Sequence, residues 1–288
     1  AKVLPTDGIF GYQFNIDFHP TRRGFIGGST RGPWRNIMTP TRGWHTDTDR
    51  STFPLRGLVP VEMRGLIGAG KNIGVSSVVQ SAIRLHGQMM HVGQAGATLA
   101  WLSLRDRIEP AELVGDLGKV RELQLVLVRG KGGPGVLLWP WHDLAPDDLH
   151  FEAANMLAVR GIWHPDKDTL FFNPTQETTR REASRILARL CRTLAHAKDW
   201  PTPSEPVFVD VSSDDPDRPF IEAIASWGIT IPTDKRFLPD KPLSARDLAA
   251  WLKQLGLPTD RSLGDSNLPN LNRAELAQHL WRALNLST

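Results

Sequence analysis

The arrangement of apolar and polar positions predicts different architectures for the two halves of the chain. In the first half, residues 10–18 alternate as a strand does, and the aliphatic, glycine-rich run at residues 65–70 predicts a buried strand that ends in a tight turn. Residues 88–104, which contain no proline, and residues 121–128 predict helices. Residues 21–50 have no sustained period and predict a long ordered loop or lid.

An internal repeat organises the second half, beyond a glycine-rich break at residues 130–135. Asp143 recurs as Asp210 and Gly161 recurs as Gly228 at an offset of 67 residues, and later landmarks recur at an offset of 65. A third copy near the C-terminus is degenerate. The pattern predicts two domains, at residues 1–135 and 136–288.

Each copy of the repeat contains a signal for the start of a helix. Thr179, Ser244 and Asn272 are residue types that accept hydrogen bonds at helix N-termini, and an acidic residue follows each of them three positions later. In the first two copies, apolar residues then recur with the 3.6-residue period of a helix. We therefore expect the second half to be mostly α-helical, with its copies packed on one another.

The composition is that of a globular protein: 40% of the 288 residues are apolar and 23% are charged. No window approaches the ~18 consecutive apolar residues of a membrane-spanning helix. The single cysteine, Cys191, excludes an internal disulfide framework and a thiolate metal cluster. No other group of side chains has the spacing of metal ligands, so we expect no metal.

The net charge of +3 is unevenly distributed. Residues 1–138 contain 17 basic and 10 acidic side chains, whereas residues 139–288 contain 17 basic and 21 acidic ones. This asymmetry indicates two modules with different partners, although ordinary surface charge explains it equally well. Neither half contains a run of Lys and Arg, so nucleic acid is not an expected partner.

Two glycine-containing segments of the first half are candidates for binding a phosphate group or a cofactor. Residues 65–72 nearly satisfy the phosphate-binding pattern G-x-x-x-x-G-K-[ST], but Asn72 lacks the hydroxyl that would hold Mg²⁺, so a P-loop enzyme is the least favoured function. Gly93 and Gly96 lie inside a predicted helix, where glycine is unfavourable by up to ~1 kcal/mol. Close approach of another element, or of a bound cofactor, would explain them.

Residues 60–100 resemble the C-terminal part of FAD-dependent oxidoreductases that have a glutathione-reductase-type flavin domain. The Gly-basic-Asn-Ile-Gly turn of that family is matched at residues 70–74, its Ser-Ala-x-Arg-x-His segment at residues 81–86, and its Gly-Gln-Ala-x-Gly helix at residues 93–97. Weaker similarity extends the resemblance over about the first 130 residues. The N-terminal glycine-rich unit with which the family binds the ADP half of FAD is absent, which indicates the C-terminal portion of a larger enzyme.

The resemblance implies FAD as the cofactor and a small organic molecule as the substrate. The turn would pass the ribityl and phosphate region of FAD, and the helix near Gly93 would direct its positive N-terminus at the flavin. Arg84 and His86 are the nearest ionisable residues and weak catalytic candidates; a surface arginine and a hydrogen-bonded histidine is the plainer interpretation. The expected cofactor-binding residues are Gly70, Lys71, Asn72, Ile73, Gly93, Gln94, Ala95 and Gly96.

The second half resembles S-layer homology repeats, in which a Thr-Arg-x-Glu box lies in a groove that binds anionic cell-wall polysaccharide. Capping alone explains the Thr and the Glu, which leaves the arginines as the indication of binding. The resemblance implies a possible polysaccharide partner and, if the repeats are functional, an extracytoplasmic or cell-wall location. The expected polymer-binding residues are Thr179, Arg180, Glu182, Arg246 and Arg273.

We therefore expect an α/β fold, a partial flavoprotein domain with a helix that faces the cofactor, followed by a mostly α-helical repeat domain. The favoured function is hydride transfer between a small organic substrate and FAD. The alternative is a non-catalytic cell-wall or polysaccharide-binding protein built on the repeats.

Overall fold

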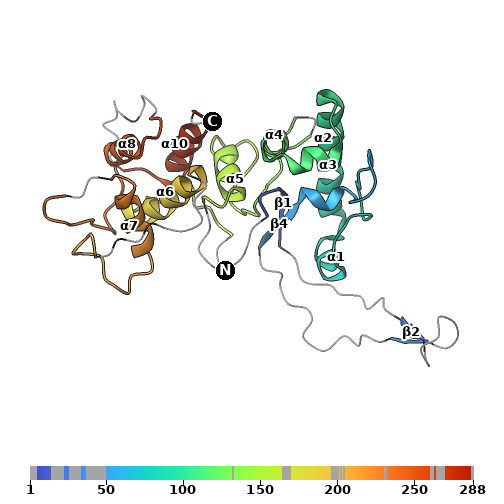
Figure 1. Ribbon diagram of the computed structural model, residues 1–288, viewed down its shortest axis with the longest axis horizontal. Coiled ribbons are helices and arrows are strands. Elements are labelled where there is room, and N and C mark those ends of the chain that lie inside the picture. The colour runs from blue at the N-terminus through green and yellow to red at the C-terminus, as the bar shows by residue number, and fades with distance from the viewer. Residues whose placement is uncertain are drawn as a thin grey trace. The chain divides into compact units, whose positions relative to one another are not determined.

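The computed structural model divides the chain into two compact units, Ala1–Pro140 and Trp141–Thr288 (Figure 1). The glycine-rich break falls inside the first unit, because the Val136 amide donates to the carbonyl of Leu127 and the Gly11 amide donates to the carbonyl of Leu137. The structure describes residues 5–13, 23–25, 34–36, 50–131, 133–163, 170–195, 201, 203, 205–229, 232–259, 263 and 270–286.

Unit 1 combines short antiparallel strand pairs with helices. Strand β1 (Gly8–Tyr12) pairs with β4 (Ser51–Pro54), and β2 (Arg23–Phe25) pairs with β3 (Trp34–Asn36). A 3₁₀ turn at Leu55–Leu58 follows β4. Four helices complete the described part of the unit: α1 (Ser77–Ile83), α2 (His86–Asp106), α3 (Pro110–Gly115) and α4 (Leu117–Val128).

The core of unit 1 lies between the β1–β4 pair and helices α2 and α4. Phe10 of β1 stacks on Phe53 of β4 and on His91 of α2, with ring centroids 5.3 and 5.7 Å apart. Gln124 of α4 is fully buried and donates from its amide to the carbonyl of Gly8 at 2.8 Å. The β1–β4 pair and α4 therefore pack against α2 and hold it in place.

The structure confirms the predicted helices and corrects two other predictions for the first half. The predicted strand at residues 65–70 is wrong: this stretch is irregular, and Leu66 is exposed. The β2–β3 hairpin lies within the predicted lid at residues 21–50. Of the strand predicted at residues 10–18, β1 includes the first three residues, and residues 14–18 lie outside the described part of the chain.

Unit 2 is helical, and three capped helices meet through their preceding segments. The Thr178 amide donates to the carbonyl of Leu271, the Leu271 amide to the carbonyl of Leu243, and the Leu243 amide to the carbonyl of Thr178. These three bonds close a ring. Helix α5 packs on α10, and α6 packs on α7. The helices are α5 (Phe151–Val159), α6 (Arg180–Leu194), α7 (Arg218–Ser226), α8 (Ala245–Gln254) and α10 (Arg273–Leu286).

The loops before the capped helices have matching carboxylate contacts. Asp143 accepts the amides of Phe172 and Asn173 at 2.7 and 2.6 Å. Asp210, which is 67 residues later in the sequence, accepts the amides of Phe237 and Leu238, both at 2.8 Å. The same side chain thus performs the same structural task at both places.

Unit 1 should lose stability as the pH falls, because of His91. Partial burial lowers the pKa of His91 from its ordinary value of 6.5. The unfolded chain therefore takes up this proton at a higher pH than the folded chain, so the free energy of unfolding falls as the pH drops through 6.5. Urea unfolding from pH 8 to pH 5, followed through NMR signals of α2, should show this loss.

The variant His91→Gln should have a weaker pH dependence over this range than the native chain. His142→Gln, at an exposed histidine of unit 2, is the matched control and should leave the pH dependence of unit 1 unchanged. Equal pH slopes for the native chain and His91→Gln would contradict the assignment.

Candidate functional site

The glycine-rich segment at residues 65–74 has an irregular backbone, which two hydrogen bonds hold in place. The Gly68 amide donates to the carbonyl of Leu58 at 2.6 Å, and the Gly74 amide donates to the carbonyl of Gly57 at 2.8 Å. Between these points, the side chains of Lys71 and Asn72 are exposed. The segment therefore presents a cation and an amide to solvent from a fixed turn.

The small residues of α2 allow this segment to pack against the helix. A Cβ atom at Gly96 would lie 3.2 Å from the Cβ of Ala69 and 3.5 Å from a methyl group of Ile67. A Cβ atom at Gly93 would lie 3.7 Å from the carbonyl oxygen of Ala69. Close approach of the glycine-rich segment thus accounts for Gly96, whereas a Cβ atom at Gly93 would make only an ordinary contact.

Two further residues that were predicted to bind the cofactor also have contacts within the protein. Ala95 is fully buried in the core of unit 1. The side-chain amide of Gln94 donates to the carbonyl of Pro134 at 3.1 Å. The contact residues expected at positions 93–96 therefore have structural roles in this unit.

The positive end of α2 lies seven residues before Gly93, because the helix begins at His86. Over the fully described stretch 84–90, no side chain caps this end, and the first turn contains no acidic residue. The amides of the first turn have no acceptor within the helix, and the space around Gly87 is open. A helix end with free amides and a positive dipole favours an anion.

The structure brings Arg84 and His86 to this helix end. Arg84 closes α1 by donating its backbone amide to the carbonyl of Gln80, and His86 opens α2 with an exposed side chain. Ala69 lies against the middle of α2, at Gly93 and Gly96. From there residues 70–76 lead to α1, and α1 ends just before α2 begins (Figure 1). The predicted residues at 70–73 thus lie in the segment that leads from the middle of α2 to α1, and those at 84–86 lie where α1 ends and α2 begins.

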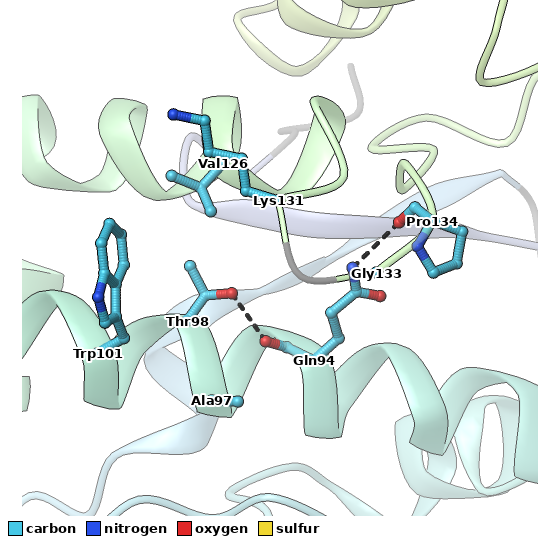
Figure 2. Close-up of a pocket in the computed structure, with 8 residues that line it drawn as sticks. All are labelled: Gln94, Ala97, Thr98, Trp101, Val126, Lys131, Gly133 and Pro134. Atoms are coloured by element: carbon cyan, nitrogen blue, oxygen red, sulfur yellow. Dashed lines mark hydrogen bonds between the residues drawn. The ribbon is translucent and has the colours of Figure 1, made fainter.

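The sequence did not predict a pocket that lies between α2 and α4 (Figure 2). It has a volume of about 590 Å³, and its wall on α2 includes Thr98 and the half-exposed indole of Trp101. The hydroxyl of Thr98 donates to the carbonyl of Gln94 at 2.9 Å. The other lining residues are Gln94, Ala97, Val126, Lys131, Gly133 and Pro134.

In unit 2, four of the five predicted polymer-binding residues hold the unit together. The Thr179 hydroxyl accepts the amide of Glu182 at 3.2 Å, as its cap position predicts. The Glu182 carboxylate forms an ion pair with Arg273 at 2.5 Å, and Arg180 forms one with Asp247 at 3.1 Å. Each of these side chains thus has a partner within unit 2.

The fifth predicted polymer-binding residue, Arg246, differs from the others in being exposed. Arg180 also lies over the rings of Phe237 and Trp251, at 5.1 and 4.7 Å from their centroids. Arg180 and Arg273 thus join α6 to α8 and to α10.

Other kinds of chemistry find no support in the described residues. No three His, Cys, Asp or Glu side chains within them are grouped as metal ligands. Burial raises the pKa of the Cys191 thiol to about 11, so it is a poor nucleophile at neutral pH. No helix follows Lys71 directly, since α1 begins at Ser77, which excludes a P-loop. None of the described helices is long and apolar enough to cross a membrane.

Comparison with known proteins finds a family similarity in the first unit. Residues 2–127 match the FAD dependent oxidoreductase family, a stretch somewhat shorter than half of the chain and contained in unit 1. No curated protein matches the chain. The family match supports an oxidoreductase function for this part of the chain, implies FAD as its cofactor and implies a small-molecule substrate.

The residues at the start of α2 fit the anionic part of FAD. The free amides of the first helical turn and the open space at Gly87 suit a phosphate group. The glycine-rich turn offers the exposed ammonium group of Lys71 as a further cation. At Gly96, by contrast, Ile67 and Ala69 lie against the helix.

Replacing Gly96 should displace the turn. The branched side chain of Gly96→Val would collide with Ala69, and overpacking of this kind lowers the free energy of unfolding by about 1–3 kcal/mol. Ala111→Val, at an exposed position of α3, is the matched control and should change it by less than about 0.5 kcal/mol. Denaturant unfolding of both variants tests this contact, and equal stabilities would contradict it.

Proposed function

We propose that unit 1 is the flavin-facing part of an FAD-dependent oxidoreductase, which transfers hydride between a small organic substrate and FAD. The observation that supports this most strongly is the uncapped N-terminus of α2, which has free amides and open space at Gly87. Bound FAD would supply the group that accepts or donates the hydride.

In this proposal the chain holds negative charge at two places. The amides of His86, Gly87 and Gln88 at the start of α2 bind a phosphate group, and the helix dipole adds to the attraction. Lys71 neutralises charge from the turn, and Asn72 offers an amide beside it. Arg84 and His86 are the candidates for contact with an anionic substrate.

The proposal assigns this chain to the flavin and phosphate half of the cofactor. The glycine-rich unit with which the family binds ADP is absent from the sequence. FMN, which lacks the AMP half, should therefore bind to this chain nearly as tightly as FAD. For unit 2, the resemblance to S-layer homology repeats and an extracytoplasmic or cell-wall location stay predictions.

The variant Gln88→Glu tests the site, because it adds a carboxylate to the first turn of α2 without a change of shape. A negative charge there stabilises the helix by up to about 1 kcal/mol, but it repels a bound phosphate by a similar amount. We expect the melting temperature to rise and the affinity for FAD and FMN to fall about fivefold. Quenching of flavin fluorescence on titration measures the affinity.

Gln176→Glu, at an exposed position of unit 2, is the matched control and should leave flavin affinity unchanged. A rise in melting temperature with unchanged flavin affinity for Gln88→Glu would place the flavin elsewhere. Failure of the native chain to bind either flavin would contradict the proposed function.

A further inference from the structure

Another pocket of unit 1 lies at the end of α2, where the chain turns into α3 (Figure 1). It has a volume of about 570 Å³, and its walls come from the last turns of α2, from the beginning of α3 with the connection before it, and from residues 64–67. Its first lining residue on α2, Ala100, comes fourteen positions after His86, which is about 21 Å along a helix. The pocket is therefore separate from the proposed flavin site.

One wall of this pocket contains the buried side chain of Ser103. Ser103 is 7% exposed, and its hydroxyl group has no hydrogen-bond partner within the part of the chain that the structure describes. A buried hydroxyl group on a helix can donate to the carbonyl four residues earlier, as Thr98 does to Gln94 at 2.9 Å. A buried donor without an acceptor is unfavourable and rare in folded proteins. Ser103 therefore supplies a hydrogen-bond donor that the described residues do not use.

Arg107 places a guanidinium group at the same pocket. It ends α2 with a left-handed backbone, at φ 56° and ψ 42°, a conformation that favours glycine. Its exposed side chain forms no ion pair or hydrogen bond with any residue that the structure describes. Arg105 pairs with Glu122 at 2.6 Å and already supplies a positive charge to this end of the helix. Neither the backbone nor a contact among the described residues thus explains an arginine at position 107.

The acidic side chains of the pocket already have partners. Glu109 and Glu112 both face Arg64, at 3.5 and 3.7 Å. The Glu109 carboxylate also accepts the backbone amide of Gly65 at 2.9 Å. Arg107 is left to attract a ligand, and a carboxylate matches the fork of donors that a guanidinium group presents. Two acidic side chains in the wall repel the nearly double negative charge of a phosphate group more strongly than the single charge of a carboxylate.

Apolar side chains form much of the remaining wall. Leu104 is 79% exposed, and Ile67 and Ile108 are half-buried. A ligand that covered them would remove apolar surface from water, which favours binding. We propose that this pocket binds a small monocarboxylate with an apolar body, whose carboxylate pairs with Arg107 and accepts the hydroxyl group of Ser103. This proposal does not depend on the flavin site.

Calorimetric titration of the full chain with phenylacetate tests the site. Phenylacetate should bind saturably and at least tenfold more tightly than phenylacetamide, which has the same body without the charge. Arg107→Gly should abolish this preference while its melting temperature stays close to that of the native chain, because glycine suits the left-handed backbone. The proposal would be overturned if phenylacetate did not saturate the native chain, if the two ligands bound equally, or if phenyl phosphate bound more tightly than phenylacetate.

Lys235→Gly is the matched control for Arg107→Gly. Lys235 is also an exposed basic residue with a positive φ, 52°, but it lies in unit 2. Lys235→Gly should keep the full preference for phenylacetate over phenylacetamide. Loss of the preference in this variant as well would overturn the assignment to Arg107.

Ser103→Ala tests the hydroxyl group separately. The variant should have a higher melting temperature than the native chain without ligand, because it removes a buried donor that has no acceptor. It should bind phenylacetate about threefold more weakly, because the carboxylate loses a hydrogen bond. Unchanged affinity for phenylacetate would overturn the role of Ser103 in the site.

Discussion

The contact between Gly96 of α2 and Ala69 of the glycine-rich segment is the constraint on which unit 1 depends. The segment lies against the helix there because Gly96 has no side chain, and a Cβ atom would be 3.2 Å from that of Ala69. Two backbone hydrogen bonds, from Gly68 to Leu58 and from Gly74 to Gly57, hold the rest of the segment. The turn that presents Lys71 is thereby fixed relative to α2.

Helix α2 serves several purposes at once because its sides differ. Val92, Leu99 and Leu102 are fully buried and form the core with the β1–β4 pair and α4. The small residues accept the glycine-rich segment, and the outward face exposes Met90, Trp101 and Leu104. The free amides at the first turn leave the beginning of the helix for an anion. A single helix of 21 residues thus links the fold and the proposed flavin site.

The sequence predicted the helices and caps well, because local signals determine them. The proline-free periodic stretch became α2, and Thr179, Ser244 and Asn272 each accept the amide three residues later. Contacts between residues that are far apart in the sequence could not be predicted from these local signals. The aliphatic run at residues 65–70 has strand composition, but of its backbone amides Gly68 alone bonds the preceding 3₁₀ turn, at Leu58, so no strand forms.

For the candidate site, local patterns named residues but could not give their contacts. The glycines at positions 93 and 96 suggested an opening for a cofactor, whereas Ile67 and Ala69 lie against Gly96. The helix predicted from residue 88 begins at His86, and Leu85 provides no capping side chain that would mark its start. In unit 2, Glu182 pairs with Arg273, a contact across 91 residues of sequence that no local pattern indicates.

Backbone NMR of the full chain during flavin titration tests the central claim most directly. If the beginning of α2 and the glycine-rich turn hold the flavin phosphate, the amide signals of residues 70–74 and 85–88 should shift together and saturate with FAD. The signal of Gly96 should move little, because this residue is buried against Ile67 and Ala69. Shifts centred on the pocket at Trp101 and Lys131 would contradict the account, as would no shift at all.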